Sequence, residues 1–238
     1  GKVVEYAVKM RELPQEALLS SLLEQRKVTN NTMDRISKVL SEFHSRAETG
    51  SHINQGGSID TIRLNWNENF EQTREFIGRT ISEVIFDALK NKVESFISEN
   101  SSLFLRRIGN ARIRDCHGDL HSNSIFVLDK IYIFDCIEFN TRFRYSDVAA
   151  DIGFLSMDLD YHRRDDLSDY FLNRYLLHSS DDEMRLLLPF YECYRAYVRG
   201  KVISFRLNEK NITEEERKNA ETNARAYFEL SSMYAAQI

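Results

Sequence analysis

Hydrophobic residues recur at helical spacing through most of the chain. Apolar positions three or four residues apart predict helices near residues 14–23, 36–47, 62–97, 148–159, 166–177 and 182–207, with a break in the third near Gly78. Thr213 followed by Glu216 has the pattern of a capping box and predicts a last helix that ends near residue 236. Because only two prolines and nine glycines interrupt 238 residues, we expect long helices to dominate.

Other segments have a different pattern. Residues 3–10 alternate weakly between polar and apolar positions and predict a strand. Residues 125–128 and 131–134 predict two short strands joined by a turn at Asp129-Lys130, and residues 50–58, which include Gly56-Gly57, predict a loop. The pattern therefore indicates an α+β fold that is mainly α, with a small β-hairpin set into a helical domain.

Composition narrows the class of protein. The formal net charge is −5, so no general positive field recruits nucleic acid or an acidic membrane. No apolar run approaches the roughly 20 residues that a membrane-spanning helix needs, and the first residues lack a signal-peptide pattern. The cysteines, Cys116, Cys136 and Cys193, are odd in number and lack metal-site spacing, so we expect free buried thiols. These features predict a cytoplasmic protein that binds neither nucleic acid nor a membrane.

Two carboxylates flank the predicted hairpin. Asp119 follows Gly118 in a polar segment, and Asp135 ends the second strand, where an unpaired carboxylate is costly to bury. A carboxylate on a tight loop can accept a hydrogen bond from a hydroxyl and orient its lone pair toward phosphorus. A carboxylate at a strand end can hold a divalent cation that also contacts phosphate oxygens. The pair is typical of phosphoryl transfer, whereas Asp residues that only cap turns would have no chemical role.

Histidines in the same segment leave a second possibility open. We expect His117 to pack against the turn and hydrogen-bond to it, and His121 to face either a phosphate or solvent. Together with Asp119 and Asp135, these histidines also form a mixed ligand set of the kind that metal-dependent phosphoesterases use.

The segment 116–125, followed by residues 134–140, resembles the aminoglycoside phosphotransferase family of the protein-kinase-like superfamily. It is most similar to an uncharacterised bacterial branch with the pattern CHGDLH…FDCIEFN. The resemblance implies the large C-terminal lobe of a protein-kinase-like fold over residues 14–238, with a catalytic loop at 115–125 and a metal-binding hairpin at 125–136. Further matching positions are Arg144, Asp147, Val148, Asp151 and residues 154–160, with residues 6–10, Asn65, Trp66 and residues 68–70.

The resemblance also implies roles for individual residues. Asp119 would be the catalytic residue that positions the acceptor hydroxyl, and Asp135 would bind magnesium. Asp151 would brace the catalytic loop by accepting backbone hydrogen bonds, while Asp147 either does the same or only caps its helix. Residues expected on the acceptor side are His121, Glu138 and Asn140.

Residues 1–13 would form the last strand of the small lobe and the hinge. Tyr6, Ala7 and Val8 would then contact the nucleotide base, ATP or GTP, through their backbone. Lys9 is similar in position to the lysine that binds the nucleotide phosphates in kinases. However, the residues after Lys9 have a helical pattern, whereas a kinase small lobe needs further strands there. We therefore expect the Gly-rich loop and the phosphate-binding lysine in a missing N-terminal lobe, upstream in the same polypeptide.

One pair of residues departs from the family pattern. The family has Gly-Asn where this chain has Asn123-Ser124, and the Asn of that pair, five residues after the catalytic Asp, ligates magnesium. Here either Asn123, shifted by one position, or the Ser124 hydroxyl would have to bind the metal. The departure therefore leaves open a degenerate nucleotide-binding module without activity.

Cationic residues later in the chain allow two interpretations. Arg195 and Arg199 lie four residues apart on one predicted helical face, with Arg206 further along. They could present a cationic wall to an anionic acceptor, but a solvated face that forms salt bridges is the favoured interpretation. The sequence thus predicts a kinase that uses Mg²⁺ with ATP or GTP and phosphorylates a hydroxyl of an unidentified small-molecule acceptor.

Overall fold

The computed structural model describes residues 12–238 of the chain. The strand expected at residues 3–10 and the hinge residues Tyr6, Ala7 and Val8 lie outside this range. The helices are α1 (Leu19–Glu24), α2 (Asn30–Arg46), α3 (Ser51–Asn54), α4 (Ile59–Thr73), α5 (Glu83–Glu99), α6 (Ser101–Gly109), α7 (Thr141–Arg144), α8 (Val148–Tyr161), α9 (Asp165–Ser179), α10 (Leu188–Phe205) and α11 (Glu214–Ala235). The strands are β1 (Ile113–Asp115), β2 (Ile125–Val127), β3 (Ile131–Ile133) and β4 (Tyr145–Asp147).

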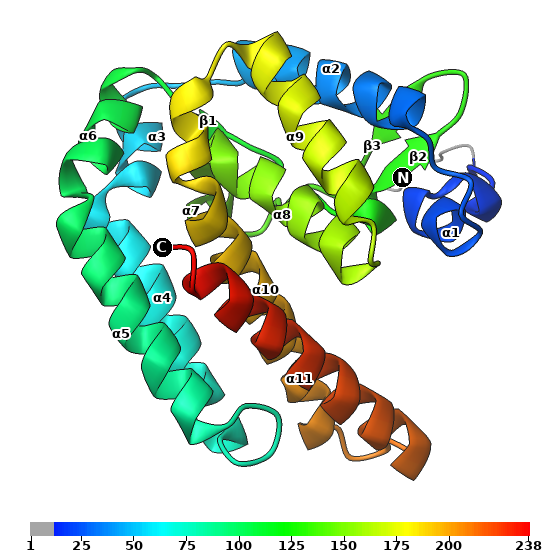
Figure 1. Cartoon of the computed structure of the whole chain (residues 1–238), viewed down its shortest axis with the longest axis vertical. Helices are drawn as coiled ribbons and strands as arrows, with labels where there is room; N and C mark the ends of the chain where they lie inside the picture. The colour runs from blue at the N-terminus through cyan, green and yellow to red at the C-terminus, as the bar shows by residue number, and fades with distance from the viewer. Residues whose placement is uncertain (1–11) are drawn as a thin grey trace, which may run out of the picture.

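The long helices pack in two groups (Figure 1). Helices α10 and α11 run antiparallel and pack against α4 and α5, while α2 lies along α9 and α8 connects the groups by packing on both α9 and α10. The β2–β3 hairpin lies beside α1 and α2. The polar segment between β1 and β2 is therefore held where the two helical groups meet.

Two antiparallel strand pairs complete the fold. Strand β2 pairs with β3, which confirms the predicted hairpin. Strand β1 pairs with β4, and this second pair was not predicted from the sequence. Strands β1 and β4 are short and far apart in the chain, so neither an alternating pattern nor a connecting turn marks their pairing, whereas a tight turn marks β2 and β3.

The helix predictions are largely confirmed. Gly78 adopts a left-handed φ of +82° in the turn between α4 and α5, where the break was expected. The capping box at the start of α11 forms, because Thr213 Oγ1 accepts from the Glu216 amide at 3.2 Å and Glu216 Oε2 accepts from the Thr213 amide at 2.9 Å. The loop predicted at 50–58 is wrong, since α3 and a 3₁₀ turn occupy it. One-turn helices bury too few residues to produce a periodic pattern.

Aromatic packing dominates the interior. Trp66 is buried in α4 and stacks on Phe70 with 5.3 Å between ring centroids, so core packing is its structural use.

Cys116 and Cys193 are buried free thiols, but Cys136 is exposed, which corrects the expectation of three buried cysteines. None of the helices in residues 12–238 combines the length and apolarity that a membrane crossing requires.

Candidate functional site

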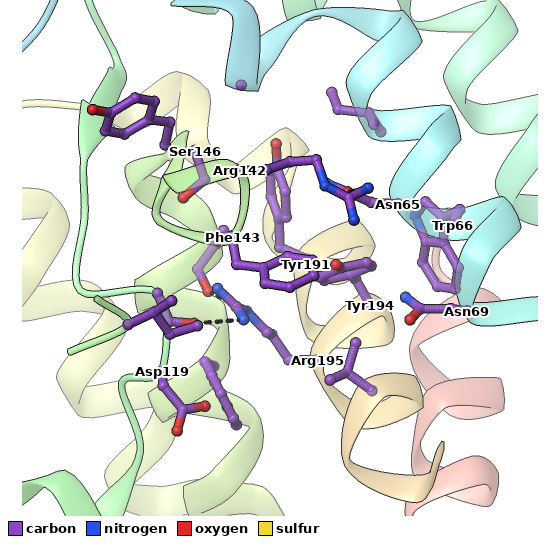
Figure 2. A pocket seen from close by; sticks show the side chains of 18 of the residues that line it. Asn65, Trp66, Asn69, Asp119, Arg142, Phe143, Ser146, Tyr191, Tyr194 and Arg195 are labelled. Atoms are coloured by element: carbon purple, nitrogen blue, oxygen red, sulfur yellow. Dashed lines mark hydrogen bonds between the residues drawn. The ribbon is translucent and has the colours of Figure 1, made fainter. Parts of the chain in front are cut away.

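Asp119 lies on the tight loop between β1 and β2. Gly118 makes the turn possible, because its φ is +83° and a Cβ at this position would lie 2.9 Å from the Phe143 carbonyl oxygen. The Asp119 side chain is 45% exposed, so it is available to a ligand. It lines a cavity of about 350 Å³ that also contacts α4, α7, α8 and α10 (Figure 2).

Two buried carboxylates of α8 hold this loop in place. Asp151 accepts hydrogen bonds from the backbone amides of His117 at 2.7 Å and Gly118 at 2.9 Å. Asp158, two turns later, accepts from the Ser122 amide at 2.8 Å. The loop backbone on both sides of Asp119 is therefore fixed to one rigid helix.

Asp151 is ionised despite complete burial. Burial by itself raises the pKa of this carboxyl, but the hydrogen bond from His44 and the electrostatic influence of His44, His117 and Arg195 outweigh it. Together they lower the pKa to about 2. An ionised acceptor strengthens the hydrogen bonds from the loop amides.

Arg195 anchors the loop from α10. Its Nη1 donates to the Gly118 carbonyl at 2.8 Å, the contact drawn in Figure 2, and its Nε donates to the Ala150 carbonyl at 3.1 Å. The residue is 6% exposed and forms no ion pair with a carboxylate among the described residues. The favoured prediction of a solvated, salt-bridged face is therefore wrong for Arg195, because the neighbouring helix and loop cover it.

The environment of Asp119 keeps its carboxylate ionised. Partial burial raises the pKa of Asp119, but the His121 hydrogen bond and the charges of His121, Arg195 and Arg199 lower it below its ordinary value. His121 Nε2 lies 3.5 Å from Asp119 Oδ2, and the His121 ring packs against Phe154. An ionised carboxylate here can accept a hydrogen bond from a substrate hydroxyl.

The His117 ring connects the Asp119 loop to the segment that carries Asp135. His117 Nδ1 accepts from the Asp119 amide at 3.2 Å, and Nε2 donates to the Phe134 carbonyl at 2.9 Å. The Ile137 amide also donates to the His117 carbonyl at 3.0 Å. This network fixes the backbone around Asp135 relative to Asp119, as expected of a histidine that hydrogen-bonds the turn.

Asp135 occupies an unusual backbone conformation directly after β3. Its φ is +64°, in the left-handed region that non-glycine residues rarely adopt, and its side chain is exposed. It lines a second cavity of about 500 Å³ together with His117, Cys116 and Phe43. Strain of this kind is concentrated at functional sites, where surrounding contacts maintain it.

Asn123 and Ser124 differ in their availability. Ser124 is buried, and its Oγ accepts from the His121 amide at 3.1 Å and donates to the His121 carbonyl at 2.8 Å. Asn123 is exposed, lacks a positive φ, and its side chain forms no hydrogen bond within residues 12–238. Of the two, Asn123 is therefore the residue whose side-chain oxygen is free to ligate a cation.

Other expected site residues have local structural contacts. Asp147 caps α8 by accepting from the Ala149 amide at 2.9 Å and forms a buried ion pair with Arg107 at 2.8 Å, which supports the capping alternative. Asn140 caps α7 by accepting from the Arg142 amide at 3.1 Å, and Glu138 is exposed. Neither of these two, nor His121, lines the cavity beside Asp119.

The four residues of the phosphoesterase hypothesis do not form a ligand cluster. In the part of the chain that the structure describes, the only side chains whose ligand atoms approach one another within 4.8 Å as a group of three are His44, Cys116 and Asp151. This group is buried, and Asp151 already accepts hydrogen bonds from the loop. His117, Asp119, His121 and Asp135 therefore lack the convergence that such a metal centre needs.

Sequence reasoning assigned no role to several residues that support the site. Asp158 lies in the matching segment 154–160, and a carboxylate on an otherwise apolar helix was the available signal. His44, which hydrogen-bonds Asp151 at 3.3 Å and Tyr175 at 2.8 Å, gave no signal, because its partners are far away in the chain.

Comparisons with known proteins concern the fold of the chain and its relatives. No protein-family model matches the chain. Uncharacterized proteins of Mycobacterium bovis and Mycobacterium tuberculosis are 34% identical over 210 residues, which cover 88% of this chain and 42% of each relative. The chain thus spans less than half the length of these relatives.

A solved structure identifies the fold. Ethanolamine kinase of Plasmodium vivax superposes with a TM-score of 0.51 at 16% identity, over 88% of this chain and 60% of that chain. At this identity the likeness concerns the fold alone. The predicted fold class is confirmed: the chain has a mainly helical α+β fold with small hairpins that matches the C-terminal lobe of this ethanolamine kinase.

Proposed function

We propose that the chain carries the catalytic and metal-binding groups of an ATP- or GTP-dependent phosphotransferase that acts on a hydroxyl of a small molecule. The observation that carries the proposal is the His117 network, which fixes an ionised Asp119 beside one cavity and Asp135 beside another. Positioning and electrostatics supply most of the catalysis in phosphoryl transfer, so two fixed carboxylates suit this reaction.

Each carboxylate would have its own role. Asp119 would accept a hydrogen bond from the acceptor hydroxyl and orient its lone pair for attack. Asp135 and Asn123 offer exposed oxygen ligands, the chemistry that Mg²⁺ prefers, and bound magnesium would neutralise charge on the nucleotide phosphates. Asp151 and Asp158 would keep Asp119 in position. Tyr6, Ala7 and Val8 stay the proposed contacts of the base.

The test compares carboxylate variants of the full-length protein. D135A should weaken Mg²⁺-nucleotide binding at least about tenfold, measured by titration calorimetry, because a charged metal ligand is removed. D119N should leave nucleotide affinity unchanged but slow hydrolysis of the terminal phosphate at least about 100-fold. D129A is the matched control, since Asp129 is an exposed carboxylate at the turn of the same hairpin. Unchanged nucleotide affinity in D135A would refute the metal assignment.

A second candidate is a nucleotide-binding module without activity. The buried Ser124 hydroxyl favours this candidate, because it is already hydrogen-bonded to the His121 backbone. Position 124 therefore offers no free ligand in place of the Asn amide that binds magnesium in the family pattern. The double variant N123G/S124N separates the two functions. Activity that appears only in the double variant would establish the inactive module, whereas activity in the natural sequence would exclude it.

A further inference from the structure

The cavity beside Asp119 is lined by an excess of positive charge. Asp119 is the only carboxylate among its lining residues, whereas the cations that line it are Arg142, Arg195, Arg199 and Lys201. Asp119 is also the group reserved for the acceptor hydroxyl in the proposed reaction. Within residues 12–238, the rest of the cavity lining therefore offers no carboxylate to balance a positively charged ligand.

Only one of these cations has a carboxylate partner in the described part of the chain. Arg142 pairs with Glu68 at 2.6 Å. Arg195 donates to two carbonyl oxygens and packs over the Phe154 ring at 4.9 Å, and Arg199 packs over the Tyr227 ring at 5.7 Å. Neither forms an ion pair within residues 12–238. The charge of Arg199 therefore remains available to an anion in a site where water screens it poorly.

Lys201 gives the clearest sign of a missing anionic partner. Its Nζ donates to Asn69 Oδ1 and Gln72 Oε1, both at 2.7 Å, and both acceptors are neutral amides. Burial lowers the pKa of Lys201, with the neighbouring Arg142 also lowering it and Glu68 opposing the change. An anion in the cavity would stabilise this ammonium, as amide oxygens alone do only in part.

Two buried donors on lining residues also lack hydrogen-bond partners within residues 12–238. Asn69 is 4% exposed, and its amide orientation is fixed because Oδ1 faces Lys201, yet Nδ2 has no hydrogen-bond partner. Trp66 Nε1 is likewise buried and unpaired. Unpaired buried donors are costly, and an oxygen-rich ligand would offset that cost. Figure 2 shows Trp66 and Asn69 across the cavity from Asp119.

We propose that the acceptor substrate is a small hydroxylated anion. Its hydroxyl lies at Asp119, and its carboxylate or phosphate oxygens lie toward Arg199, Lys201 and Asn69. This assignment rests on the proposed function, because it uses Asp119 as the partner of the reacting hydroxyl. An ammonium acceptor, such as the one named in the ethanolamine kinase, would instead meet Arg195, Arg199 and Lys201.

The single tryptophan of the chain provides a direct measurement. Trp66 lines the cavity, so its fluorescence in the 238-residue chain reports binding there without any nucleotide. The probes are open-chain six-carbon polyols that differ mainly in charge: gluconate, sorbitol 6-phosphate, neutral sorbitol and cationic glucamine. We expect gluconate, sorbitol 6-phosphate or both to bind at least about tenfold more tightly than sorbitol or glucamine. The better of the two anions distinguishes a carboxylate from a phosphate substrate.

Charge-removing variants locate the effect. R199Q and K201Q should each weaken binding of the better anion about tenfold or more, and higher ionic strength should weaken it further. Gln at position 201 can still donate to Asn69, so this variant removes mainly the charge. R206Q is the matched control, because Arg206 follows the same helix but is exposed and lies outside the cavity. Melting temperatures of all variants show whether each one is folded.

The outcomes separate this inference from the proposed function. Equal binding of all four polyols, no anion response, tighter binding of glucamine, or equal losses in R199Q and R206Q would overturn the anionic acceptor. Anion binding at Trp66 together with unchanged nucleotide affinity in D135A would uphold the acceptor assignment and overturn the metal site. Nucleotide-dependent activity on glucamine alone would uphold the proposed function and overturn the acceptor assignment.

Discussion

Replacement of Asp151 by Asn removes the charge that holds the Asp119 loop. The carboxyl has a pKa of about 2 against an ordinary value of 3.8. This difference corresponds to about 2 kcal/mol of stabilisation at neutral pH. The Asn side chain has one oxygen, so it also leaves either the His117 or the Gly118 amide unpaired, at about 1–2 kcal/mol. We therefore expect D151N to lower the free energy of unfolding by about 3–4 kcal/mol.

The pH dependence of this loss gives a second test. Because the folded pKa lies below the ordinary value, the ionised group stabilises the protein fully above pH 3.8, and the stabilisation is lost as the pH falls toward 2. The difference between wild type and D151N should therefore be fully present at pH 5, and its charge-dependent part should fall by about half at pH 3.

Urea unfolding, followed by far-UV circular dichroism at pH 7 and at pH 3, measures both effects. D166N is the matched control, since Asp166 also lies in the first turn of a helix but is 64% exposed and pairs with Arg164. D166N should lower the free energy of unfolding by less than about 1 kcal/mol. Equal losses in D151N and D166N, or a D151N loss below about 0.5 kcal/mol, would refute the bracing role, because surface substitutions already fall in that range.

Two further predictions concern single residues. Gly118→Ala should cost about 1–3 kcal/mol in urea unfolding, because φ is +83° and the new Cβ would lie 2.9 Å from the Phe143 oxygen. Gly109→Ala, where nothing lies within 4 Å, should cost nothing, and equal effects would contradict the steric argument. Glu192 is buried against Ser156, and burial raises its pKa to about 7 from 4.5. The free energy of unfolding of the wild type should therefore fall by about 3 kcal/mol as the pH rises from 4.5 through 7, whereas that of E192Q should not. Parallel pH profiles of the two proteins would contradict this assignment.

Helices were predictable because their pattern is local. Apolar periodicity located α2, α8 and α10, and the capping box located the start of α11. The pairing of β1 with β4 was not predictable, because hydrogen bonds between distant three-residue segments leave no periodic trace. The short helix α3 was missed for the same lack of pattern.

The site was predictable in its acidic residues but not in its charge balance. Asp119 and Asp135 are conspicuous in sequence, because a tight loop and a strand end give a carboxylate no packing role. Arg195 and Arg199 were visible at helical spacing, yet spacing alone does not distinguish a solvated cation from a buried one. The missing carboxylate partners of Arg199 and Lys201 become evident only when every neighbour of the cavity is known.

The sequence by itself determined the helical character of this protein, the hairpin at 125–133, and the loop that carries Asp119. These features depend on residues close together in the chain, through side-chain periodicity, capping and turn geometry. Only the tertiary structure decided that Ser124 is already hydrogen-bonded, that Arg195 is buried against the loop, and that the cavity beside Asp119 is cationic. Burial and electrostatic environment depend on contacts between α4, α8 and α10, which the fold brings together from distant parts of the chain.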